Sequence, residues 1–268
     1  MYPMQHAEIV ARAFVAARHA ATGLPEYPGG ALPETLDDAY AIQHRAIDLF
    51  GDAIAGWKVG KIPNPLDVAF GTNRLAGPIF ASSVVHAEGA VPEMPMFAEG
   101  FGAAEAEYLL RLGELPADFD RAWTNEDVAA HVDRLCVGIE IASSPFPEIN
   151  DHGPAVTVSD FGNNNGLVVG EEISRESGFL DWPVALTIDS EVAGTGTAAE
   201  MLDGPFGAVR FLFELAARGV VPLATGQWIS TGAVTGVHPV RPGQRVVARF
   251  GDTLTVECRM SVAGASGK

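Results

Sequence analysis

Three glutamates in two apolar stretches are the residues of this sequence best suited to chemistry. Glu105 and Glu107 lie in the run 102–110, and Glu140 lies in the run 136–142. Side chains two residues apart share one face of a β-strand, about 7 Å apart, whereas on a helix they point to different sides. A neighbouring strand, about 4.8 Å away, could bring Glu140 to the same place.

Three carboxylates at such short range repel one another unless a cation lies among them. Mg²⁺ and Mn²⁺ suit such a site because hard divalent ions prefer oxygen ligands and keep some waters, whose positions a substrate could take. The alternative is a solvated acidic surface, since Glu-Ala-Glu is a common tripeptide. Glu140 favours the metal site, because a charged side chain is rarely found in an apolar strand unless it is paired or metal-bound.

The composition is that of a globular protein with a strongly negative charge. The chain has 268 residues, 47% of them hydrophobic and 19% charged, which allows a large core. Its net charge of −17 argues against nucleic acid and anionic membranes as partners. Because no apolar stretch could span a bilayer and the N-terminus has no signal-peptide pattern, we expect a cytoplasmic protein. Cys136 and Cys258 are expected to be buried free thiols.

The order of the expected elements indicates the fold class. Apolar residues at helical spacing predict helices over residues 6–21 and 39–50, the second with Thr35 at its N-terminal cap. Strand-like runs follow at residues 53–59, 102–110, 136–142, 184–189, 228–230, 244–250 and 254–260, with a helix at 203–217. This pattern predicts an α+β protein with a mostly β core. We divide it into an N-terminal helical segment, residues 1–75, and a β-rich catalytic domain, residues 76–268.

Five motifs, in order along the chain, carry a family resemblance. They are Gly-Trp-Lys-Val-Gly at 56–60, Ala-Glu-Ala-Glu-Tyr at 104–108, Gly-Ile-Glu-Ile-Ala at 138–142, Val-Ser-Asp-Phe-Gly-Asn-Asn-Asn-Gly at 158–166 followed by Val-Val-Gly at 168–170, and Ile-Ser-Thr-Gly at 229–232 followed by Pro-Val-Arg-Pro-Gly at 239–243. As an ordered set they resemble the 2-keto-4-pentenoate hydratase branch of the fumarylacetoacetate hydrolase superfamily.

The resemblance implies a fumarylacetoacetate-hydrolase-like fold, a rolled mixed β-sheet core with an N-terminal helical segment, assembled as a homo-oligomer. It implies Mg²⁺ or Mn²⁺ held at Glu105, Glu107 and Glu140, with Lys58 nearby. Family members act on short 2-oxo or 2-hydroxy-dienoic acids from the catabolism of aromatic compounds. The expected activity is that of a lyase, a hydratase that adds water to 2-hydroxypenta-2,4-dienoate or a relative to give a 4-hydroxy-2-oxo acid.

An anionic 2-oxo acid needs a positive group beside this acidic site. Lys58, Lys61 and Arg74 are the candidates. We expect Lys58 to be catalytic, as an acid/base or as a partner of the substrate carboxylate, since burial lowers the pKa of a lysine towards neutrality. The alternative for Lys58 is a salt bridge to one of the glutamates. Lys61 and Arg74 are expected to bind substrate, or else to lie on the surface.

Polar residues in two other motifs complete the expected site. Asp160 is assigned a catalytic role, in which it hydrogen-bonds and orients a water or a metal ligand without binding the metal itself. Its alternative role is to cap its own turn, which the surrounding Asn and Gly residues would favour. Ser230 and Thr231 are expected to hydrogen-bond the substrate carboxylate, against an ordinary turn.

Two departures from the family pattern leave the substrate open. The pattern often follows its lysine with Gly-Leu-Thr-Ser, whereas residues 59–65 read Val-Gly-Lys-Ile-Pro-Asn-Pro. It also commonly has an acid just before the glycine equivalent to Gly77, and residues 73–76 contain none. Three alternatives to the hydratase are therefore considered. Two are enzymes: a decarboxylase of a 2-oxo-enedioate such as 4-oxalocrotonate, and an acylpyruvate C–C hydrolase. The third is a non-catalytic partner of a paralogous enzyme in a decarboxylase–hydratase complex.

Overall fold

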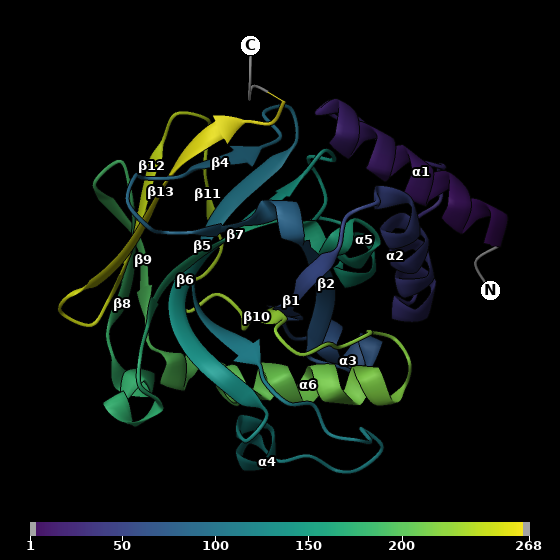
Figure 1. Ribbon diagram of the computed structural model, residues 1–268. Helices are drawn as coiled ribbons and strands as arrows, with labels where there is room; N and C mark the ends of the chain where they lie inside the picture. The colour runs from purple at the N-terminus through teal and green to yellow at the C-terminus, as the bar shows by residue number, and fades with distance from the viewer. Residues whose placement is uncertain (1–3, 265–268) are drawn as a thin grey trace.

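The computed structural model describes residues 4–264, which form two β-sheets flanked by helices (Figure 1). The strands of the larger sheet are β1 (Ile54–Lys61), β2 (Arg74–Phe80), β3 (Val84–His86), β5 (Phe101–Leu112), β6 (Val132–Ser144), β7 (Asn164–Glu172), β10 (Trp228–Ser230) and β11 (His238–Pro239). They run in the order β2-β1-β10-β5-β6-β7-β3, and β11 pairs with β5. Parallel and antiparallel pairs both occur, so the sheet is mixed.

The smaller sheet lies on one side of the larger one in Figure 1. Its strands are β4 (Glu93–Met96), β8 (Val184–Ile188), β9 (Glu191–Gly196), β12 (Arg245–Phe250) and β13 (Leu254–Val262). They run in the order β4-β13-β12-β8-β9. The helices are α1 (Met4–Ala20), α2 (Leu36–Phe50), α3 (Leu66–Phe70), α4 (Asn125–Ala129), α5 (Pro154–Ser159) and α6 (Pro205–Ala217).

Helices α1, α2 and α5 gather on the side of the larger sheet opposite the smaller one (Figure 1). Helix α2 begins where the sequence predicts, because the Thr35 hydroxyl accepts the Asp38 N–H at 3.1 Å and so satisfies one unpaired donor of the first turn. The helix ends at Gly51, whose φ of 79° favours glycine. Val10 and Phe14 of α1 pack with Ile42 of α2 in one apolar cluster, which fixes the two helices together.

The main core lies between the two sheets and helix α6. From β5 it takes Ala104, Ala106, Tyr108, Leu110 and Leu112, all at even positions. From the smaller sheet and α6 it takes residues such as Val246, Val256 and Leu212. Because strand side chains alternate between faces, the odd-numbered residues of β5 must point to the opposite face of the larger sheet.

That opposite face carries the candidate site. Lys58 lies between Trp57 and Val59, and Glu140 between Ile139 and Ile141, all four neighbours belonging to the main core. Alternation therefore turns Lys58 and Glu140 to the same face as Glu105 and Glu107. A separate apolar cluster lies on the same face and consists of Ile79, Leu109, Cys136, Leu167, Val169 and Trp228.

The predicted fold class is confirmed: the protein is α+β, with a mixed β-sheet core and an N-terminal helical segment. The division at residue 75 stays a prediction; β1 belongs to the larger sheet and β2 crosses residues 75 and 76. Cys136 and Cys258 are buried free thiols, as expected. Among residues 4–264, no helix has both the length and the apolar character needed to cross a membrane.

Candidate metal centre and its cavity

The three glutamates meet on adjacent strands. Antiparallel pairing of β5 with β6 sets Glu105 directly opposite Glu140, and Glu107 is two residues further along the same face. One carboxylate oxygen from each residue lies within 4.8 Å of the other two. All three side chains are buried, with exposed fractions of 4%, 0% and 0% for Glu105, Glu107 and Glu140. The convergence that the strand pattern predicts is thus present in the fold.

The state of these carboxylates fits a hard divalent cation. Glu107 Oε1 and Glu140 Oε2 are buried and have no hydrogen-bond partner among the described residues, an arrangement that is costly unless something else binds them. Burial and then the charge of Glu140 raise the pKa of Glu105 to about 7. Burial, followed by Glu140 and Glu105, raises the pKa of Glu107 well above its usual value. An oxygen-only donor set of this kind suits Mg²⁺ or Mn²⁺.

The raised pKa of Glu105 predicts that the metal-free protein loses stability as the pH rises. A group whose folded pKa, here about 7, exceeds its unfolded value stabilises the fold fully below the unfolded pKa and loses that contribution as the pH passes through the folded one. Between pH 5 and pH 8 we expect the melting temperature in EDTA to fall on the order of 5 °C more in the wild type than in Glu105→Gln. Calorimetry on both proteins measures this; equal pH profiles would contradict it.

Lys58 places one positive charge against the acidic trio. Its Nζ lies 3.7 Å from Glu140 Oε1 and donates a hydrogen bond to Asn163 Oδ1 at 3.4 Å. Burial lowers the pKa of Lys58, but the charges of Glu140, Glu105 and Glu107 together outweigh burial and raise it. The expectation of a lowered pKa is therefore wrong for the metal-free chain. When all three carboxylates are ionised, the trio and Lys58 together carry two negative charges, which one divalent ion would neutralise.

Glu107 is held by the last residue of β10 and the loop that follows it. Ser230 Oγ donates to Glu107 Oε2, and the Gly232 N–H donates to the same oxygen at 3.0 Å. Thr231 Oγ1 donates instead to the backbone oxygen of Tyr108 at 2.7 Å. These bonds leave Glu107 Oε1 as the oxygen without a partner in the described part of the chain. Ser230 and Thr231 do not line the cavity described below. In the metal-free protein they hold the carboxylate and the strand, and their expected contact with the substrate stays a prediction.

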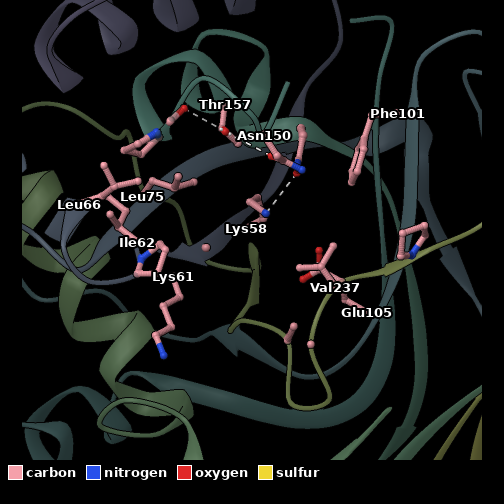
Figure 2. A pocket seen from close by; sticks show the side chains of 18 residues that line it. Lys58, Lys61, Ile62, Leu66, Leu75, Phe101, Glu105, Asn150, Thr157 and Val237 are labelled. Atoms are coloured by element: carbon pink, nitrogen blue, oxygen red, sulfur yellow. Dashed lines mark hydrogen bonds between the residues drawn. The ribbon is translucent and has the colours of Figure 1, made fainter. Parts of the chain in front are cut away.

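A cavity of about 630 Å³ opens beside Lys58 and Glu105 (Figure 2). Its polar walls come from Asn150, Thr157 and Asn163, and its charged walls from Lys58, Lys61 and Glu105. The apolar side chains that line it are Ile62, Pro63, Leu66, Leu75, Phe101, Pro154, Val237 and Pro239. Lys61 is exposed and extends away from Lys58 in Figure 2, so it lies at the rim.

The structure keeps the two remaining predicted residues out of the cavity. Arg74 is buried and ion-paired with Asp203 on the way into α6, and it does not line the cavity. The expected role of Arg74 in binding substrate stays a prediction. Asp160 is fully buried behind the site, where Arg18 Nε donates to its Oδ1 at 2.6 Å and Ser144 Oγ to its Oδ2 at 2.6 Å. Its role stays a prediction.

Sequence reasoning missed several residues that touch the site. Asn164 Nδ2 donates to Glu140 Oε1 at 2.8 Å, and Asn150 and Thr157 form a polar wall of the cavity. The Asn-Asn-Asn run at 163–165 is visible in the sequence, but it predicts a turn as readily as a site. Arg18 sits in an amphipathic helix beside other basic residues, and nothing in the sequence distinguishes it.

Comparison with known proteins is informative through structure only. No protein-family model matches the chain, and no curated protein matches it by sequence. Solved structures do match. The 4-oxalocrotonate decarboxylase from Pseudomonas putida G7, complexed with magnesium and adipate, aligns with a TM-score of 0.81 and 22% identity over 97% of this chain and 99% of that one.

Two further structures align less closely. Fumarylpyruvate hydrolase from Pseudomonas aeruginosa, in complex with Mn²⁺ and pyruvate, gives a TM-score of 0.57 at 15% identity, over 77% of this chain and 88% of that one. The 2-hydroxyhepta-2,4-diene-1,7-dioate isomerase from Mycobacterium marinum gives 0.56 at 18% identity, over 80% and 77% of the two chains. At these identities the likeness establishes a shared fold, and the chain has the fold of this group of enzymes.

Proposed function

We propose that the protein is a metal-dependent hydratase that converts 2-hydroxypenta-2,4-dienoate, or a closely related short dienoic acid, into a 4-hydroxy-2-oxo acid. One observation carries the proposal: three buried carboxylates, two of whose oxygens have no partner within residues 4–264, lie beside a buried lysine at one cavity. The shared fold with enzymes solved in complex with magnesium or Mn²⁺ and small acids supports it. A divalent ion bound there would act as a Lewis acid towards the carboxylate and ketone oxygens of a 2-oxo acid.

The chain's own groups would supply the proton transfers. Hydration of the dienol moves the enol proton to the far carbon of the chain, adds the water oxygen at C4 and a proton at C3. Lys58 Nζ is the buried, charged donor beside the cavity, and it is the group we assign to these transfers. Asn163 holds the lysine from behind through its Oδ1, which limits the rotamers from which Lys58 can reach the substrate.

The walls of the cavity favour a substrate with one carboxylate and a hydrocarbon end. Among the described residues that line it, the only cation apart from Lys58 is Lys61 at the exposed rim. Ile62, Leu66 and Leu75 lie together on the side of Lys58 away from Glu105 in Figure 2. A hydrocarbon tail gains free energy by burial against such side chains, whereas a second carboxylate there would lose its hydration without a partner.

A 2-oxo-enedioate decarboxylase is the second candidate. Lys61 is the observation that favours it, because a substrate long enough to reach the rim could place its distal carboxylate beside that ammonium group. The fold shared with 4-oxalocrotonate decarboxylase is consistent with this second activity.

A product assay separates the candidates, and we expect the hydratase outcome. With Mg²⁺ or Mn²⁺ present, 2-hydroxypenta-2,4-dienoate should lose its dienol absorbance without release of CO₂, at a kcat/KM at least about tenfold above that of the matching enedioate. That ratio corresponds to about 1.4 kcal/mol. Faster turnover of the enedioate with stoichiometric CO₂ would instead establish the decarboxylase.

A C–C hydrolase and a non-catalytic partner protein would each give a distinct result in the same assay. Pyruvate released from an acylpyruvate would identify the hydrolase. No turnover of any of the three substrates with either metal would reject catalysis and support the non-catalytic partner. Sedimentation of the purified protein, alone and with a paralogous decarboxylase, would then measure both the proposed homo-oligomer and the proposed complex.

A further inference from the structure

We propose that Arg18 of helix α1 is a positioning residue for the candidate metal centre. In this inference, Arg18 clamps a left-handed turn over residues 161–163, and the asparagines in and after this turn orient Lys58 and Glu140. The inference rests on the proposed function, because it assigns Glu140 to a metal ion and Lys58 to proton transfer.

The clamp is a buried ion pair with two parallel hydrogen bonds. Arg18 Nε donates to Asp160 Oδ1 at 2.6 Å, and Arg18 Nη2 donates to Asp160 Oδ2 at 2.8 Å. The side chains of Arg18 and Asp160 are only 5% and 0% exposed. Arg18 also donates to the Ser143 and Asn164 backbone oxygens and to Asn165 Oδ1. One guanidinium thus ties helix α1 to β6 and to both sides of the turn.

The turn that follows Asp160 has an unfavourable backbone. Phe161, Gly162 and Asn163 have consecutive φ values of 57°, 59° and 59°. Residues other than glycine rarely adopt this left-handed region. Gly77 of β2 accommodates it, since a Cβ there would lie 2.0 Å from the Phe161 oxygen. The Arg18 guanidinium lies 5.1 Å from the centroid of the Phe161 ring. A backbone of this kind persists only where its neighbours fix it.

The turn presents two amide side chains to the site. Asn163 Oδ1 accepts from Lys58 Nζ at 3.4 Å, and Asn164 Nδ2 donates to Glu140 Oε1 at 2.8 Å. Because Asn164 occupies Oε1, the oxygen of Glu140 that remains without a partner among the described residues is Oε2. The position of the turn therefore selects the oxygen that is free for an ion. If the turn relaxes, both Lys58 and Glu140 lose their orientation.

Arg18 could instead serve only to fasten helix α1, and a second variant separates the two roles. Val10 is a fully buried residue of the same helix, in the apolar cluster with Phe14 and Ile42. Val10→Ala loosens the packing of α1 and leaves every hydrogen bond of Arg18 in place. If Arg18 serves only to dock the helix, Arg18→Met and Val10→Ala will weaken Mn²⁺ binding equally when they lower the melting temperature equally.

The test compares Mn²⁺ affinity, measured by electron paramagnetic resonance, with melting temperature in the full-length protein. We expect Arg18→Met to weaken Mn²⁺ binding about 10- to 100-fold, as loss of a group behind a metal ligand does elsewhere. Val10→Ala should bind Mn²⁺ with a dissociation constant within about twofold of the wild-type value, because it removes no group behind a metal ligand. An unchanged Mn²⁺ affinity in Arg18→Met would overturn the inference.

A double variant guards against misfolding, because Arg18→Met leaves Asp160 as an uncompensated buried charge. Arg18→Met/Asp160→Asn removes both charges and should fold, yet it should still bind Mn²⁺ at least about tenfold more weakly than the wild type, the lower end of the same range. Wild-type affinity in the double variant would overturn the clamp and leave the proposed function standing. A wild-type protein that binds no Mn²⁺ would reject the proposed function, and the inference with it.

Discussion

Glu107→Gln is expected to abolish tight binding of divalent cations and, at the same time, to raise the melting temperature of the metal-free protein. Glu107 is fully buried, and burial together with Glu140 and Glu105 raises its pKa well above the usual value. Glutamine keeps an oxygen to accept from Ser230 Oγ and the Gly232 N–H. The substitution therefore removes an unfavourable charge without breaking the local hydrogen bonds, which is the signature of a site that sacrifices stability for function.

The expected size of this effect is large. Loss of a direct ligand should weaken Mn²⁺ binding by more than about 100-fold, the upper end for groups that act behind the ligands, and activity at limiting metal should fall in proportion. The melting temperature in EDTA should rise by several degrees, at about 2–4 °C for each kcal/mol gained. Titration with Mn²⁺ and calorimetry measure the two quantities on one preparation.

The matched control for Glu107→Gln is Glu191→Gln, the same change at an exposed position of β9. It should alter neither Mn²⁺ affinity nor melting temperature appreciably, since exposed substitutions usually stay within about 0.5 kcal/mol. Wild-type metal affinity in Glu107→Gln would show that the protein does not bind a metal ion at the proposed centre.

Lys58→Met is expected to lose catalysis but to keep metal binding, unlike Glu107→Gln. The Lys58 ammonium lies 3.7 Å from Glu140 Oε1, where it competes with any cation for the same carboxylates, so its removal should leave Mn²⁺ affinity unchanged or higher. Loss of an acid/base group should lower kcat by about 10²- to 10⁴-fold. The raised pKa of Lys58 arises from the three glutamates; an ion that neutralises them leaves burial, which lowers the pKa, as the main influence.

Steady-state kinetics and Mn²⁺ titration on Lys58→Met decide between a catalytic lysine and a structural salt bridge. Arg249→Met, which removes a cation from an exposed position of β12, is the control and should match the wild type in both measurements. If Lys58→Met loses metal affinity and stability together and recovers its activity at saturating Mn²⁺, then Lys58 only holds Glu140 in place.

Local spacing made part of the site predictable. Side chains at positions 105 and 107 must share one face of any strand that contains them, and the apolar neighbours of Glu140 required a second buried strand. The pairing that sets Glu105 opposite Glu140 is formed only in the folded sheet. The sequence nevertheless restricts it, because only some registers bury the apolar residues of both strands on the same face. The lysine, by contrast, entered through the resemblance, and its place beside Glu140 emerged from the pairing of β1 with β10 and β10 with β5.

Several contacts of the predicted residues were not predictable, because the partners lie far away in the sequence. Arg74 had the charge expected of a substrate ligand, and in the fold it pairs with Asp203, 129 positions away in the sequence. Ser230 and Thr231 had the hydroxyls expected to hold a substrate carboxylate, and in the fold both donate hydrogen bonds to residues of strand β5.

By itself the sequence determined the α+β class, the helix starts set by local capping, and a pair of acids on one strand face, because each depends on neighbours within a few residues. Only the tertiary structure decided that Arg18 lies beneath the site, which oxygen of Glu140 stays free, and which cation reaches the cavity. Those outcomes depend on contacts between segments far apart in the chain, and no spacing along the sequence encodes them.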